Sequence, residues 1–261
     1  MTDRILTRRE GHVAQVVFNN PERHNAMSFD MWEATAAALE SFAKDDNVRV
    51  VVLSGAGGKA FVSGADISKF GAERASEDAV RTYNAMTERA YDAIYSFPKP
   101  TIAMIQGYCI GGGMALAICC DLRIATPGSR FGVPAAKLGL GYEYRGVKRL
   151  VDVVGPSFAK EIFYTARQFD AEEARMMGLV NRIVPDAELE TYVSNYADTI
   201  GGNAPLTIGA IKLTVGEALK DAAERDLRRV EEAVQTCFRS KDYTEGRTAF
   251  MEKRKPVFTG R

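Results

Sequence analysis

The densest group of glycines reads Gly107-Tyr-Cys-Ile-Gly111-Gly112-Gly113 and follows an apolar, strand-like run over residues 101–105. It opens an apolar segment that we expect to be a helix over residues 112–119. The first amides of a helix have no acceptor within it and lie at the positive end of its dipole. Because glycine lets a ligand approach the main chain closely, the segment predicts an anion or oxyanion site. Close packing of a helix on a strand is the alternative explanation of the glycines.

A second segment, Phe61-Val-Ser-Gly64-Ala65-Asp66-Ile67, follows an apolar run over residues 48–53 and a glycine-rich loop over residues 55–58. In α/β sheets, ligands bind beyond the ends of strands. Ala65 can offer only its backbone N–H, and Asp66 is typical of a helix cap. Two backbone donors from two such loops, directed at one oxygen, would form an oxyanion hole.

The composition excludes several classes of partner. The 261 residues include 34 Lys+Arg and 34 Asp+Glu, and the zero net charge argues against nucleic acid. No run approaches the roughly 18 apolar residues of a membrane span. The only histidines, His12 and His24, leave no H-E-x-x-H motif, and we expect no metal site. Four cysteines without a C-x-x-C pair, and a start that lacks a secretory signal, favour a cytoplasmic protein.

The elements that position these segments follow from hydropathy. Apolar runs over residues 13–18, 48–53, 101–105 and 122–125 predict buried strands, and helical spacing predicts a helix capped by Ser28 and another opened by Ser76. The alternation predicts a layered α/β fold. Asp170 and Glu173 form a capping box, and a strand over residues 179–184 follows. Beyond it we find only helix signals. We therefore predict an α/β core over residues 1–185 and a helical region over residues 186–261.

Several motifs in this order resemble the crotonase family of enoyl-CoA hydratases and isomerases. They are P-E-R-H-N-A-M at 21–27, F-V-S-G-A-D-I at 61–67, P-K-P-T-I-A-M-I-Q-G-Y-C-I-G-G-G at 98–113, C-D-L-R-I-A at 120–125, F-G-V-P-A-A-K-L-G-L-G at 131–141 and F-M-E-K-R-K at 250–255. The resemblance implies a spiral core of ββα units, a helical C-terminal trimerisation region, and an enzyme that assembles as a homotrimer or a dimer of trimers.

The resemblance also implies the substrate and the residues that contact it. The substrate is an acyl-CoA thioester, as in fatty acid metabolism, and coenzyme A enters as part of it, so no separate cofactor is expected. The backbone N–H groups of Ala65 and Gly112 hold the thioester oxygen. The positions implied to bind the CoA ester are Arg23, Asn25, Ala26, Ala65, Asp66, Ile67, Ser68, Gly112 and Lys253. A solvated surface charge is the alternative for Arg23 and Lys253.

The chain departs from the family where hydratases carry their two glutamates, because Ala115 and Ala135 stand at those positions. The paired-carboxylate chemistry of hydration cannot be assigned to it. Glu143 matches the place of the single acidic catalytic residue of some isomerases in the family. One carboxylate suffices for isomerisation, and we expect Glu143 to be the acid/base. The alternative is a local ion pair of Glu143 with Arg145 or Lys148.

Other activities remain open on the sequence. The position of Tyr142 resembles that of a tyrosine in bacterial methylmalonyl-CoA decarboxylase, although that enzyme has a histidine where this chain has Ala65. Tyr142 and Tyr144 alternatively shape the acyl pocket. A decarboxylase, an atypical hydratase and a non-catalytic binder of CoA esters are therefore alternatives to the isomerase.

Overall fold

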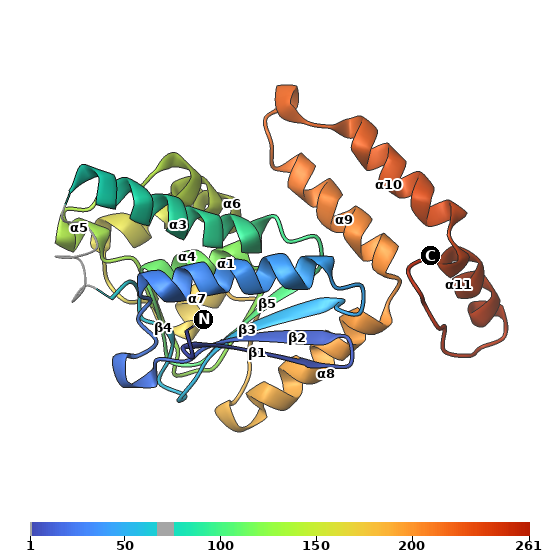
Figure 1. The fold of residues 1–261 in the computed structure, drawn as a ribbon, viewed down its shortest axis with the longest axis horizontal. Helices are drawn as coiled ribbons and strands as arrows, with labels where there is room; N and C mark the ends of the chain where they lie inside the picture. The colour runs from blue at the N-terminus through green and yellow to red at the C-terminus, as the bar shows by residue number, and fades with distance from the viewer. Residues whose placement is uncertain (1, 67–75) are drawn as a thin grey trace.

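The computed structural model describes residues 2–66 and 76–261, and within them the strands form two sheets (Figure 1). The larger sheet has the strand order β1-β2-β3-β5-β7-β9, antiparallel between β1 and β2 and parallel elsewhere. Its strands are β1 (Ile5–Glu10), β2 (Val13–Phe18), β3 (Val50–Gly55), β5 (Thr101–Ile105), β7 (Leu122–Ala125) and β9 (Arg182–Ile183). The smaller, parallel sheet contains β4 (Ala60–Val62), β6 (Tyr108–Ile110) and β8 (Arg130–Gly132).

The two sheets are linked by a repeated unit of two strands and a helix. In each unit the first strand joins the larger sheet and the second joins the smaller one, as in β3 and β4, then β5 and β6, then β7 and β8. The helices that follow are α3 (Glu77–Tyr95), α4 (Gly112–Cys119) and α5 (Ala135–Leu138). This succession confirms the predicted α/β class and shows the ββα units directly.

Both faces of the larger sheet are covered by helices, which explains why its central strands are apolar throughout. Helix α1 (Phe29–Lys44) packs on α3 and on one side of the sheet, with Met31, Trp32 and Leu39 buried. Helix α8 (Leu189–Gly202) covers the other side (Figure 1) and buries Leu189 and Val193 against β3, β5 and β7. The core therefore lies in two layers above and below the sheet.

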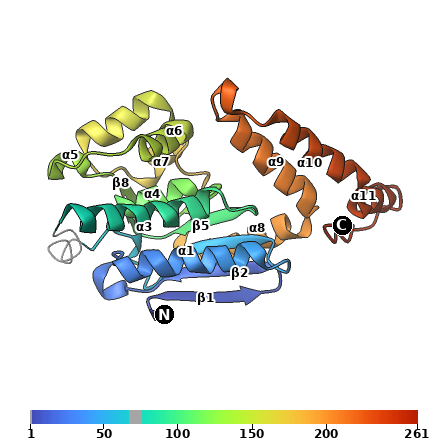
Figure 2. The same cartoon turned by 45° about the horizontal axis from the view of Figure 1, so that its top comes forward.

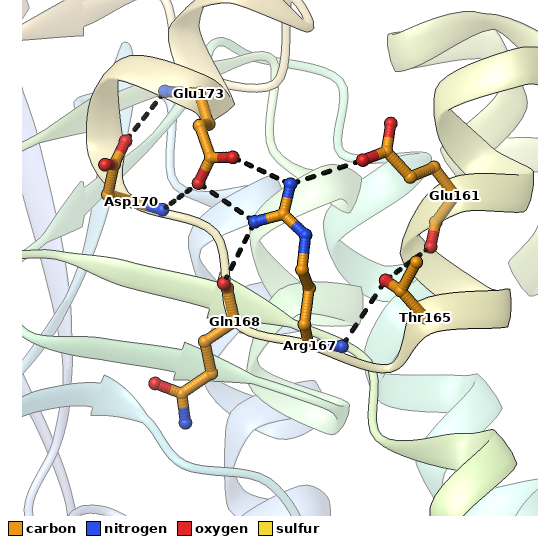
Figure 3. Close-up of polar contacts among 6 residues, drawn as sticks. All are labelled: Glu161, Thr165, Arg167, Gln168, Asp170 and Glu173. Carbon is orange, nitrogen blue, oxygen red and sulfur yellow. Dashed lines mark hydrogen bonds and ion pairs between the residues drawn. The ribbon is translucent and has the colours of Figure 1, made fainter.

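The predicted capping box is confirmed at the start of α7 (Ala171–Met176). Asp170 Oδ1 accepts from Glu173 N at 2.8 Å, and Glu173 Oε2 accepts from Asp170 N at 3.0 Å (Figure 3). The Arg167 guanidinium, which lies between α6 and α7 in the chain, donates to the carboxylates of both Glu173 and Glu161. Phe169, between Arg167 and Asp170, forms two backbone hydrogen bonds with Phe131 of β8. The polar cluster therefore holds this segment against the edge of the smaller sheet.

The remaining helices follow β8 and β9 in the chain. Helix α6 (Tyr144–Thr165) bends at Gly155, where φ is 75° and ψ is 167°. Helices α9 (Pro205–Ala218), α10 (Leu227–Arg239) and α11 (Lys241–Met251) form an arm that extends from the α/β core (Figures 1 and 2). Short 3-10 turns occupy Pro21–Arg23, Asp186–Glu188 and Ala222–Glu224. The predicted division at residues 185 and 186 stays a prediction.

No described helix combines the length and apolar character needed to cross a bilayer.

Candidate active site

The glycine triplet serves two purposes at neighbouring residues. A Cβ atom on Gly113 would lie 2.7 Å from the carbonyl carbon and 2.8 Å from the Cβ of Val62, so Gly113 allows α4 to pack directly on β4. Gly111 has a φ of 55° and donates its N–H to Gly132 O of β8 at 2.8 Å. Gly112 begins the helix, and its N–H donates to no acceptor in the part of the chain that the structure describes. The Gly112 amide is therefore left for a ligand.

The other end of α4 is closed by a buried guanidinium. Arg123 is 5% exposed and donates to Ala117 O at 3.2 Å, to Cys120 O at 2.6 Å and to Leu179 O at 2.6 Å. Its positive charge lies where the helix dipole is negative, and it adds a donor to the carbonyls of Ala117 and Cys120 at that end. Burial lowers the pKa of Arg123 from its usual value. Helix α4 is thus fixed at both ends.

Ala65 lies beside the start of α4. Met27 N donates to Gly64 O and Asp66 N donates to Met27 O, both at 2.8 Å, and this parallel bridge directs the N–H of Ala65 to the opposite side. A Cβ atom on Gly64 would lie 3.9 Å from Gly112 N, so the two turns are in contact. Among residues 2–66 and 76–261, the Ala65 N–H has no acceptor either. The two unused amides thus come from adjacent turns at the ends of β4 and β6.

A third turn, over residues 20–26, is held in place by Asn25. Its side chain is fully buried, and Nδ2 donates to Ala56 O at 3.0 Å and to Ala60 O at 2.7 Å. Its Oδ1 accepts from Asn20 N at 2.8 Å. These bonds compensate for a φ of 56°, which non-glycine residues rarely adopt. Asn25 therefore ties three backbone segments together, and its part in binding CoA stays a prediction.

Arg23 and Asp66 link that turn to the Ala65 segment. Arg23 Nη1 lies 3.4 Å from Asp66 Oδ1, and the Asp66 side chain is 5% exposed whereas that of Arg23 is 58% exposed. Arg23 is thus a cation anchored on a buried carboxylate beside Ala65, rather than a fully solvated charge. Ala26 is half-buried, and its carbonyl accepts from the Asn20 side chain. Ile67 and Ser68 lie outside the described residues.

The structure does not bring Lys253 to this cluster within one chain. Lys253 follows α11, with a φ of 54°. Figures 1 and 2 both place α11 at the end of the arm, away from α4 and the smaller sheet. Its contact with the nucleotide end of CoA stays a prediction.

The loop between α5 and α6 supplies Tyr142 and Glu143. The Tyr142 ring packs edge-on against Phe163 with centroids 4.9 Å apart, and burial raises the pKa of its phenol. Glu143 precedes the first residue of α6 and is exposed. Arg145 pairs with Asp92 and Lys148 pairs with Asp152. Among the residues placed by the structure, the local ion pair considered as the alternative for Glu143 is therefore absent.

An aromatic wall that the sequence analysis did not single out faces Gly112. A Cβ atom on Gly112 would lie 3.4 Å from both Trp32 Cη2 and Tyr91 Oη. The two rings pack edge-to-face with centroids 5.3 Å apart, and Trp32 Nε1 donates to Tyr83 Oη at 3.1 Å. Helical spacing placed these residues on α1 and α3 but carried no signal that the two helices meet over α4.

As far as residues 2–66 and 76–261 show, the site has backbone donors and phenols but few acidic groups. Ala115 and Ala135 place no carboxylate at α4 and α5, and Ala135 is 5% exposed. The described residues contain no cluster of three or more His, Cys, Asp or Glu side chains suited to a metal ion. Burial raises the pKa of Cys119 to about 12, so this thiol is protonated at neutral pH. The arrangement can polarise a carbonyl oxygen through main-chain amides.

Comparisons with known proteins give a consistent result over the whole chain. A family model described as "Enoyl-CoA hydratase/isomerase" matches residues 8–261. A crotonyl-CoA hydratase of Syntrophomonas wolfei is 34% identical over 256 residues, which cover 98% of each protein. A carnitinyl-CoA dehydratase of Escherichia coli is 34% identical over 272 residues, covering 100% of each. The crystal structure of an enoyl-CoA hydratase/carnithine racemase from Magnetospirillum magneticum matches with a TM-score of 0.93 and 38% identity, covering 100% of this chain and 97% of that one. These matches confirm the fold predicted from the motifs.

Proposed function

Because the chain belongs to the enoyl-CoA hydratase/isomerase family, the crotonases, we propose that it binds an acyl-CoA thioester. In this complex the carbonyl oxygen accepts hydrogen bonds from the amides of Ala65 and Gly112. The reaction that we propose moves the double bond of an enoyl group. The chain is an enzyme of this family. Relatives whose names refer to crotonyl-CoA and carnitinyl-CoA support a thioester of coenzyme A as the substrate. We further propose that the reaction uses no other cofactor, so that dialysis against a chelator leaves the activity unchanged.

The observation that carries the proposal is the pair of unused amides from adjacent turns. Removing a proton next to a thioester moves negative charge onto its oxygen. Preorganised N–H donors at that oxygen stabilise the charge, and the loss of one donor costs about 3–4 kcal/mol in comparable sites. Both donors are main-chain groups, so they are present whichever side chains line the acyl pocket.

Glu143 is our candidate for the proton transfer. It would take a proton from C2 of a 3-enoyl thioester, the double bond would move to C2–C3, and the same carboxylic acid would return the proton to C4. The exposed Glu143 carboxylate is not engaged by the neighbouring basic side chains, which pair elsewhere. Hydration is the activity that the names of several relatives favour. Because alanines stand at positions 115 and 135, however, the chain has no pair of carboxylates at those positions that could activate water for hydration.

The test is a spectrophotometric comparison of 2-enoyl-, 3-enoyl- and methylmalonyl-CoA with the wild type and Glu143→Gln. We expect turnover of the 3-enoyl substrate and its loss in the variant. Glu188→Gln is a matched control, because Glu188 also precedes the first residue of a helix but lies at α8. Full activity of Glu143→Gln would exclude Glu143 as the base. Preferential turnover of methylmalonyl-CoA would instead favour the decarboxylase. Binding of the esters without any turnover would favour a non-catalytic binder of CoA esters.

We also propose that the chain assembles as a homotrimer or a dimer of trimers. The arm presents large apolar side chains to solvent, including Ile211 at 61%, Phe250 at 82% and Met251 at 80% exposure. Exposed apolar surface of this kind is typical of an association interface. Sedimentation should show an oligomer at micromolar concentration, and a stable monomer would contradict the proposal.

A cytoplasmic location completes the proposal. Cys109, Cys119, Cys120 and Cys237 are all free thiols, as is usual in a reducing compartment. Cell fractionation should recover the protein with cytoplasmic markers.

A further inference from the structure

We infer that Arg149 is a positioning residue, which places the Glu143 carboxylate for proton transfer by holding the start of α6 against α3. This role rests on the proposed function, because Glu143 is our candidate acid/base. Glu143 precedes the first residue of α6, and the segment before it contains Gly139 and Gly141. Within the described ranges, the Glu143 side chain forms no hydrogen bond or ion pair. Its position therefore depends on the position of the helix that follows it.

The start of α6 is joined to α3 by a network of two cations and two carboxylates. Arg145 and Arg149 are four residues apart on α6, and Glu88 and Asp92 are four residues apart on α3, so each pair lies on one face of its helix. Arg149 Nη2 lies 2.9 Å from Glu88 Oε1 and 2.5 Å from Asp92 Oδ1. Arg145 Nη1 lies 3.2 Å from Asp92 Oδ2 and 3.8 Å from Glu88 Oε1. Each cation thus contacts both carboxylates, and the charges of the network balance.

Arg149 is the member of this network that fixes the geometry. Its side chain is 7% exposed, whereas that of Arg145 is 65% exposed. The Arg149 guanidinium also lies over the Tyr95 ring, 4.9 Å from its centroid. Water competes with exposed ion pairs, so the contacts of Arg145 contribute little by themselves. A buried cation would be left uncompensated if it moved away from its partners, so Arg149 holds α6 and α3 in one arrangement.

The same turn of α3 reaches the start of α4. Tyr91 directly precedes Asp92, and its Oη lies 3.4 Å from where a Cβ atom of Gly112 would stand. The turn that faces Gly112 is thus also the turn that Arg149 holds, so Arg149 relates the segment carrying Glu143 to the Gly112 amide. A base must lie within reach of the proton that it removes, and a misplacement near 1 Å can cost about 10²-fold in rate. Loss of Arg149 should therefore slow the proton transfer.

The test is a double-mutant cycle on the isomerisation of a 3-enoyl-CoA by the wild type, Arg149→Met, Glu143→Gln and the double variant. We expect Arg149→Met to lower kcat by about ten- to thirtyfold and to leave KM within about twofold, because it misplaces the base and not the thioester. In the Glu143→Gln background the same change should alter kcat by less than about twofold, because an absent carboxylate cannot be misplaced. Arg149→Lys should keep most of the rate, since a single nitrogen makes both contacts and an ammonium group can replace it.

Lys148→Met is the matched control. Lys148 precedes Arg149 on α6, but its ion pair is with Asp152 of the same helix, so its loss leaves the connection to α3 in place. We expect its kcat within about twofold of the wild type. Asp92→Asn is a second variant, which removes the carboxylate shared by both arginines at almost constant volume, and it should also lower kcat. If Arg149→Met does not fold, Asp92→Asn takes its place in the cycle.

The outcomes separate this inference from the proposed function. Equal factors of loss with and without Glu143 would indicate a general packing role and overturn the inference. So would an unchanged kcat in folded Arg149→Met or Asp92→Asn. Full activity of Glu143→Gln, or a wild type that does not turn over the 3-enoyl ester, would instead show that the proposed function itself is wrong.

Discussion

Replacement of Gly113 by alanine should disable the site through a shift of the backbone alone. The added methyl group would overlap the Val62 carbonyl oxygen, which is the nearest atom, and would lie 2.7 Å from the Val62 carbonyl carbon, whereas ordinary contact begins near 3.4 Å. The start of α4 and the end of β4 must therefore separate by at least about 0.7 Å. Overpacking of this kind costs about 1–3 kcal/mol. Because Gly112 moves with the helix and Ala65 follows the strand, the two amides would separate, and a misplacement near 1 Å can cost about 10²-fold in rate.

The assay measures kcat/KM on the enoyl-CoA substrate and the melting temperature of Gly113→Ala beside those of Gly216→Ala. Gly216 also lies within a helix, but a Cβ atom there would meet nothing within 4 Å. The control should gain about 0.5–1 kcal/mol of stability from the lower flexibility of the unfolded chain. We expect Gly113→Ala to melt earlier and to lose about two orders of magnitude in kcat/KM. A Gly113→Ala protein with wild-type activity would refute the argument that the strand fixes the position of the amides.

Three further predictions concern other parts of the fold. Trp32→Phe should lower the free energy of unfolding, measured in urea, by about 1–3 kcal/mol, because it removes the hydrogen bond to Tyr83 and leaves a cavity in the core. A loss below about 0.5 kcal/mol, which is typical of a surface substitution, would contradict this prediction. Gly155→Ala should cost about 1–3 kcal/mol in thermal unfolding, because φ 75° and ψ 167° suit only glycine; an unchanged melting temperature would exclude strain. Arg254 lowers the pKa of Glu245 to about 2, so the stability that this pair contributes is present above the usual value of 4.5 and is lost as pH falls towards 2. The melting temperatures of the wild type and Glu245→Gln should therefore converge over that range, and a constant difference would argue against the pair.

The sequence predicted the elements that are buried on both faces. The strands over residues 13–18, 101–105 and 122–125 and the helix over 112–119 have the predicted bounds. Their apolar runs are continuous because helices cover the sheet on both sides. The predicted strand over 179–184 was too long. Leu179 and Val180 donate their N–H groups to Ala174 O at the end of α7, so the backbone bonds to β7 begin only at Asn181 N and the strand itself is limited to residues 182–183.

The three strands of the smaller sheet were not predicted. Each contains three residues, too few for an alternating pattern, and each lies beside glycines that favour loops. The motifs predicted which two amides belong together, but the reason for their proximity is tertiary. It depends on the contact of Gly113 with Val62 and on the bond from Gly111 to Gly132. The aromatic wall escaped prediction for the same reason, since Trp32 and Tyr91 are 59 residues apart (91 − 32).

The fastening of α4 at both ends has a consequence for how such an enzyme changes its substrate. Arg123 holds the last turn, while Gly111 and Gly113 hold the first, so the Gly112 amide of our proposed oxyanion hole belongs to a helix that is fixed at both ends. On the proposed function, we expect selectivity among acyl groups to come from the side chains of α1, α3 and the segment before α6. We expect substitutions in these segments to change which acyl group binds without changing how the amides polarise its carbonyl. On this proposal, the choice of acyl group and the activation of its carbonyl depend on separate parts of one protein.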